Sequence, residues 1–247
     1  MPEDWDAATY DRIADPQARW GATVVGWLEL SGSERVLDAG CGSGRVTERL
    51  LERLPNGHVV ALDGSSSMID EARRRLAPFG ERITFMVADL LDPLPVDPPV
   101  DAILSTATFH WVPDHDALFR NLSAVLRPGG QLAAQCGGRG NLASVERALD
   151  DIGAPGFADK TYASAEETRT RLETFGFRDI ECWLHDEPTP FESADALETF
   201  LSTVVLRRYV EARTPAESRA FLHDVVSRLP SFELDYVRLN MRARRAS

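Results

Sequence analysis

The stretch that decides the fold runs from Val36 to Gly44 and reads Val-Leu-Asp-Ala-Gly-Cys-Gly-Ser-Gly. Its apolar start predicts a buried strand, and its alternate glycines predict a turn whose backbone can approach a ligand closely. The apolar residues that follow, between Val46 and Leu54, recur at helical spacing. A helix that begins at such a turn points its first amide groups at the turn, where they can bind a polar or anionic ligand.

The same strand-and-helix pattern repeats along the chain. Apolar runs predict further strands at 59–62, 83–87, 100–104 and 131–135, with helices between them at 68–76 and 116–126. Strands that alternate with helices at this spacing indicate a parallel sheet covered by helices. Near the end, the alternating residues 236–242 predict a closing strand that suits an antiparallel neighbour.

The length of 247 residues allows one or two domains. We expect a core made of residues 1–192 and 231–247, and a helical insertion over 193–230 that caps the substrate site. Two arginines in this insertion, Arg207 and Arg208, are candidates for binding an anionic substrate. The alternative is that both lie on a solvated helix face.

Charge and composition exclude several classes of protein. The net charge of -12 repels phosphate backbones, so we expect no nucleic-acid partner. There is no apolar run long enough to span a membrane and no secretory signal, which predicts a cytoplasmic protein without a membrane partner. The three cysteines form no pair with metal-ligand spacing, so no metal is expected. We expect a monomer or a weak homodimer.

Acidic residues end three of the predicted strands: Asp38, Asp63 and Asp89. In an open parallel sheet these positions share the carboxyl edge, where ligands bind. The alternative for each one is a structural cap on the following helix. The glycine spacing differs from that of nicotinamide dinucleotide sites, because position 45 is Arg. A nicotinamide-dependent oxidoreductase is therefore only a remote alternative.

Five segments in order resemble the motifs of the class I S-adenosylmethionine-dependent methyltransferases. They are residues 36–44, 61–69 (ALDGSSSMI), 85–92 (FMVADLLD), 101–114 (DAILSTATFHWVPD) and 126–132 (LRPGGQL). The resemblance implies an α/β, Rossmann-like sheet of seven strands in the order 3-2-1-4-5-7-6, with the last strand antiparallel. Residues 111–115 (WVPDH) are also similar to the small-molecule branch that contains trans-aconitate methyltransferase.

The resemblance also implies a cofactor, S-adenosyl-L-methionine, which leaves as S-adenosyl-L-homocysteine. Gly40, Gly42 and Gly44 would wrap its amino-acid part, and Asp38 would organise that turn and approach the methionine ammonium. The remaining cofactor positions implied by the motifs are Asp63 for the ribose hydroxyls, Gly64 and Met68 along the adenine, Asp89 and Leu90 at the adenine edge, and Ser105 near the transferred methyl group.

The roles of His110 and Trp111 depend on the acceptor. His110 is a candidate general base or orients an acidic substrate, and the alternative is a packed structural histidine. Trp111 either walls the substrate pocket or belongs to the core, and Trp5 and Tyr10 are candidates for a lid over the cofactor. The expected activity is methyl transfer to a small molecule, with a carboxylate among the candidate acceptors. The alternative is C- or O-methylation in natural-product biosynthesis.

Overall fold

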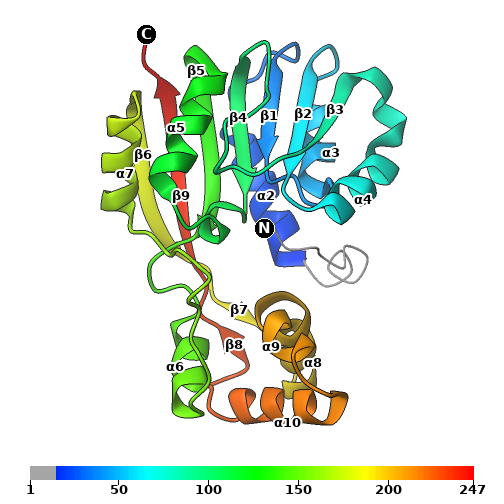
Figure 1. Cartoon of the computed structure of the whole chain (residues 1–247), viewed down its shortest axis with the longest axis vertical. Helices are drawn as coiled ribbons and strands as arrows, with labels where there is room; N and C mark the ends of the chain where they lie inside the picture. The colour runs from blue at the N-terminus through cyan, green and yellow to red at the C-terminus, as the bar shows by residue number, and fades with distance from the viewer. Residues whose placement is uncertain (1–14) are drawn as a thin grey trace.

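A seven-stranded sheet with the order β3-β2-β1-β4-β5-β9-β6 forms the centre of the chain (Figure 1), in a computed structural model that describes residues 15–247. Strand β9 is the seventh strand of this sheet along the chain, because β7 and β8 pair with each other in a separate two-stranded sheet. The expected strand order is therefore confirmed. The antiparallel last strand is confirmed as well, because β9 runs antiparallel to both of its neighbours. The candidate lid residues Trp5 and Tyr10 lie outside the described residues. The strands are β1 Arg35–Ala39, β2 His58–Asp63, β3 Ile83–Val87, β4 Val100–Thr106, β5 Leu126–Gly137, β6 Phe177–Asp186 and β9 Val237–Arg245.

Both faces of the sheet are covered by helices, because alternate residues of each strand point to opposite sides. Val36 and Val59 pack with α2 Asp15–Gly26, α3 Arg45–Glu52 and α4 Ser66–Leu76. Leu37 and Val60, one position further along, pack with α5 His115–Val125 and α7 Ala165–Thr174 on the other face. This double cover explains why the central strands are continuous apolar runs. It leaves the carboxyl edge of the parallel strands for the site.

Helix starts follow local sequence signals. Ser164 caps α7 in a capping box, in which its Oγ accepts from Glu167 N at 3.1 Å and its own amide donates to Glu167 Oε2 at 2.9 Å. Thr214 caps α10 Pro215–Val226 in the same way with Glu217. No helix within residues 15–247 is long and apolar enough to cross a membrane.

A second apolar cluster is formed by Trp20 together with side chains from residues 142–157, 197–206 and 221–236. The elements in and around the last three segments lie below the carboxyl edge of the sheet (Figure 1), and we call them the helical region. They are α6 Ala143–Asp151, β7 Thr189–Pro190, α8 Ala194–Phe200, the π-helical turn η3 Leu201–Val205, α9 Arg207–Glu211, α10 and β8 Glu233–Leu234. Helix α6 lies in the stretch that the expected domain boundaries assign to the core. Its Val145 and Leu149 nevertheless share the second cluster with Leu222 and Val225 of α10.

Candidate active site

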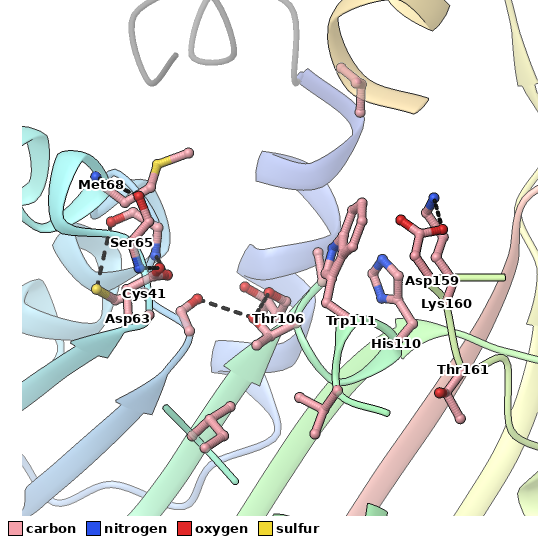
Figure 2. A pocket seen from close by; sticks show the side chains of 18 of the residues that line it. Cys41, Asp63, Ser65, Met68, Thr106, His110, Trp111, Asp159, Lys160 and Thr161 are labelled. Carbon is pink, nitrogen blue, oxygen red and sulfur yellow. Dashed lines mark hydrogen bonds and ion pairs between the residues drawn. The ribbon is translucent and has the colours of Figure 1, made fainter. Parts of the chain in front are cut away.

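A cavity of about 550 Å³ lies at the carboxyl edge of the parallel strands, next to the helical region. Figure 2 shows its two sides, which carry different chemistry. The turn side is formed by residues 40–43, 63–65, Met68 and residues 88–91. The basic side is formed by His110, Trp111, Asn141, residues 159–162, Arg208, Tyr236 and Arg238.

The glycine turn after β1 is held against the neighbouring strands. The amides of Gly40 and Cys41 donate to the Leu62 carbonyl at 2.7 and 2.9 Å. Gly40 and Gly42 have φ values of +85° and +54°, in the left-handed region that favours glycine. A Cβ on Gly40 would lie 2.1 Å from Thr108 Oγ1, whereas a Cβ on Gly42 would meet no atom within 4 Å. The turn therefore packs tightly at Gly40, and at Gly42 it presents bare backbone.

Two of the expected acids line the turn side. Asp63 Oδ2 accepts from the Gly42 amide at 2.8 Å, and its Oδ1 accepts from Ser65 N at 2.9 Å. Burial raises the pKa of Asp63, and these amide bonds oppose that shift. Asp89 Oδ1 accepts from Leu91 N at 3.0 Å. The structure thus brings Asp63 and Asp89 to one cavity wall, as their positions at strand ends predict.

The other expected cofactor positions divide between the wall and the layer behind it. Gly64, Met68 and Leu90 line the turn side, while Asp38, Gly44 and Ser105 do not line the cavity. Ser105 is buried and its Oγ donates to the Ala39 carbonyl at 2.6 Å. It supports the turn from behind, because this bond directs its hydroxyl away from the cavity.

Asp38 is fully buried behind the glycine turn. Its Oδ2 accepts from Thr47 Oγ1 at 2.7 Å, and its Oδ1 has no hydrogen-bond partner. Burial raises the pKa of Asp38 to about 7, with the Thr47 bond opposing and the nearby Asp63 charge adding to the shift. An unpartnered buried carboxylate is costly, so a proton on this group is favoured.

His110 lies on the basic side in the short 3₁₀ helix η2 Phe109–Trp111. Its ring contacts the rings of Trp111 and Tyr162, with centroid distances of 5.3 and 6.0 Å. Nδ1 accepts a hydrogen bond from the Gly137 amide at 3.2 Å. Burial lowers the pKa of His110 well below its usual value, and the Arg238 and Lys160 charges lower it further. The ring is therefore neutral and carries its proton on Nε2.

The basic side contains residues that no sequence motif marks. Lys160, whose side chain is 5% exposed, lies over the rings of Trp111 and Phe157 at 4.6 and 4.4 Å. Arg238 of β9 is 3% exposed, and its Nε lies 3.4 Å from Gln135 Oε1. Asp159 Oδ2 accepts from Arg208 Nη1 at 2.9 Å. The one available signal was that Lys160 is the only lysine of the chain.

The two candidate arginines of the insertion have different positions. Arg208 lines the cavity, whereas Arg207 does not and pairs with Glu211 through its Nε at 2.6 Å. Trp111 lines the cavity. Among the described residues, no group of three or more His, Cys, Asp or Glu side chains could hold a metal ion.

Comparison with known proteins places these features in a family. Residues 36–130 match the model of a methyltransferase domain. The chain is 36% identical to a trans-aconitate 2-methyltransferase of Methylobacterium nodulans over 181 residues, which cover 73% of this chain and 67% of the relative. It belongs to the class I S-adenosylmethionine-dependent methyltransferases. A second relative, the trans-aconitate 2-methyltransferase of Paracidovorax citrulli, is 30% identical over 230 residues, covering 89% of this methyltransferase and 86% of the relative.

Solved structures show the same fold at low identity. Phosphoethanolamine N-methyltransferase 2 of Haemonchus contortus, in complex with S-adenosylhomocysteine, has a TM-score of 0.64 at 18% identity. The matched region covers 97% of this chain and 57% of the Haemonchus contortus chain. The YcgJ protein of Bacillus subtilis has a TM-score of 0.63 at 14% identity, and the matched region covers 93% of this chain and 99% of the YcgJ chain.

The methyltransferase uses S-adenosyl-L-methionine as methyl donor. The turn side fits such a ligand, because bare backbone at Gly42 and the carboxylates of Asp63 and Asp89 face one cavity. Family membership thus gives methyl transfer, and not hydride transfer to a nicotinamide, as the activity.

Proposed function

We propose that this methyltransferase transfers the methyl group to a carboxylate oxygen of a small organic acid. The relatives above carry the name of an enzyme that acts on trans-aconitate, a small molecule with several carboxylates. The basic side supports the same class of acceptor. Among its described residues are three basic side chains, Lys160, Arg208 and Arg238, and one acidic side chain, Asp159.

The observation that carries the proposal is the burial of Arg238 and Lys160 at the cavity wall. Arg238 is 3% exposed and the Lys160 side chain 5% exposed, yet both line the cavity. Their positive charges give this wall a local field that favours an anionic acceptor, such as a carboxylate, in the cavity. Burial is the main reason why the pKa of the neighbouring His110 is lowered, and the field of these cations lowers it further.

In this reaction the protein needs only to bind the two substrates and align their reacting atoms. S-adenosylmethionine, when bound, supplies a methyl group made electrophilic by its sulfonium. A carboxylic acid is already ionised at neutral pH, so no residue has to remove a proton. The basic side orients the carboxylate and excludes water, and alignment alone contributes about 7–11 kcal/mol in well-oriented systems.

In this proposal His110 is a hydrogen-bond donor and not a base. Its Nδ1 is already occupied by the Gly137 amide, so the Nε2 proton is available to an acceptor oxygen. Trp111 forms the wall beside it. On the turn side, Asp63 would hold the ribose hydroxyls and Asp89 the adenine amino group. Gly40 and Gly42 would lie along the amino-acid part of the donor.

We also propose that the helical region selects the acceptor. Arg208 of α9 and residues 204 and 205 of η3 line the cavity, and Asn141 and Leu142 line it just before α6 begins. The substrate cap therefore comprises the insertion over 193–230 together with α6. Elements at this edge of a sheet set substrate choice while the sheet remains constant.

A labelling experiment tests the acceptor class. The enzyme is incubated with S-adenosylmethionine carrying a radiolabelled methyl group and a panel of carboxylic acids, phenols and amines. Methyl esters release the label as volatile methanol in mild base, whereas C-, N- and aryl O-methyl products keep it. Base-labile label on one or more acids is the expected result. Base-stable label on a phenol or carbon acid, without turnover of acids, would contradict the proposal and favour natural-product methylation.

A further inference from the structure

Asp159 is a carboxylate placed among cations on the cavity wall. Its Oδ2 lies 2.9 Å from Arg208 Nη1, and its Oδ1 lies 3.5 Å from Lys160 Nζ. All three side chains line the cavity, and Figure 2 shows Asp159 and Lys160 next to His110. The Asp159 side chain is 26% exposed, so it is reachable from the cavity. A carboxylate of the protein thus contacts the donors that an anionic ligand would use.

The surrounding contacts hold Lys160 and the α9 helix without Asp159. Lys160 lies over the rings of Trp111 and Phe157. The Tyr209 hydroxyl of α9 donates to the carbonyls of Pro155 and Gly156 at 2.7 and 3.0 Å, which ties α9 to the loop before Asp159. Rotation of the Asp159 side chain would therefore leave the two cations in place.

Resting on the proposed function, we propose that Asp159 occupies the place of the acceptor's second carboxylate between Lys160 and Arg208. An acid with a second carboxylate exchanges with Asp159, which rotates toward solvent. An acid with one carboxylate leaves Asp159 where it is. Selectivity arises because a charged group is favoured at this position and a methyl group is not. Asp159, Lys160 and Arg208 are then specificity-determining residues for acids with two or more carboxylates.

The test is a binding titration that needs no turnover. Enzyme saturated with S-adenosylhomocysteine is titrated with trans-aconitate, fumarate and crotonate; fumarate and crotonate differ by one carboxylate in place of a methyl group. Asp159→Asn removes the competing charge, so fumarate and trans-aconitate should bind at least about threefold more tightly, with crotonate unchanged. Lys160→Met should weaken the binding of fumarate at least about tenfold and the binding of crotonate less than about threefold.

The matched control is Glu211→Gln. It removes a carboxylate from the neighbouring Arg207 of the same short helix, at a position outside the cavity. It should change the affinity of none of the three acids. Thermal unfolding of each variant shows whether the fold is intact.

Three outcomes would overturn the proposal. One is an Asp159→Asn variant that binds all three acids more weakly by the same factor, because Asp159 would then only stabilise the cavity wall. The second is equal effects of Lys160→Met on fumarate and crotonate, and the third is a wild-type enzyme that binds none of the acids. The expected titration pattern without methylation of any acid would instead contradict the proposed function and leave the anion subsite intact.

Discussion

Alanine at Gly40 and alanine at Gly42 should damage different properties of the enzyme. Both residues have positive φ, at which an L-residue costs about 1–2 kcal/mol. At Gly40 the new Cβ would also lie 2.1 Å from Thr108 Oγ1 and 2.6 Å from Thr108 Cβ, and such overpacking adds about 1–3 kcal/mol. Gly40→Ala should then cost about 3 kcal/mol, which lowers the melting temperature by roughly 6–12 °C in a protein of this size.

At Gly42 the new Cβ meets no protein atom within 4 Å, although the residue lines the cavity. Gly42→Ala should therefore cost only about 1 kcal/mol of stability. It should nevertheless weaken S-adenosylhomocysteine binding at least about tenfold, because the methyl group occupies the space of the ligand.

Thermal unfolding and calorimetric titration of both variants test this separation. The double variant Gly40→Ala/Thr108→Gly removes the clashing side chain and should recover at least about 1 kcal/mol, as a coupling in a double-mutant cycle. Normal ligand affinity in Gly42→Ala would refute the assignment of the turn to the methyl donor. A Gly40→Ala variant as stable as Gly42→Ala would refute the steric argument.

Further expectations concern single side chains. Asp63→Asn should weaken S-adenosylhomocysteine binding at least about tenfold in calorimetry, with the circular dichroism spectrum unchanged. Arg208→Gln should raise the KM of an acid acceptor at least about threefold, while Arg207→Gln, which alters a pair outside the cavity, leaves KM unchanged; equal effects would contradict the different positions of the two arginines. The folded chain retains the Asp38 proton that the unfolded chain releases between pH 3.8 and about 7, so this group contributes stability that is lost as pH rises through that range. The free energy of unfolding of Asp38→Asn, measured with urea, should accordingly rise by about 2 kcal/mol relative to that of the wild type between about pH 5.5 and 8.5. A difference in the free energy of unfolding that stays constant over this range would show that Asp38 ionises normally in the fold. Because His110 stays neutral, methylation of an acid should show no inflection near pH 6.5, and His110→Gln, which keeps a donor, should retain more activity than His110→Phe.

Local patterns in the sequence were sufficient for the sheet and for the turn side of the site. The glycines around Gly42 and the acids Asp63 and Asp89 follow strands directly, and parallel strands bring their carboxyl ends to one edge. Their meeting at one cavity depends on strand order, which the resemblance to the methyltransferase family implied. Ser105 occupies the right strand end, but its hydrogen bond to the Ala39 carbonyl turns it away from the cavity.

Helix α6 escaped prediction because its start carries no local signal. Leu142, at its N-cap, has φ +59° and makes no side-chain cap. The first turn is capped instead by Asp235, whose carboxylate accepts from Ser144 N at 2.9 Å and from Ser144 Oγ at 2.6 Å. A cap supplied 91 positions away along the chain becomes visible only in the folded structure.

The sequence by itself determined the parallel sheet and the turn side of the cavity, because both depend on short segments in which a strand is followed directly by its turn. The order of the strands followed from the resemblance of these segments to the family. Only the tertiary structure decided the basic side of the cavity. Lys160 comes from a loop, Arg208 from α9 and Arg238 from the antiparallel strand β9, and they meet only because β9 inserts between β5 and β6 while the helical region packs beneath the sheet. The same packing places Arg208 in the cavity wall and leaves its neighbour Arg207 outside it, paired with Glu211. Charges that are far apart in sequence acquire a common field only when burial places them around one cavity.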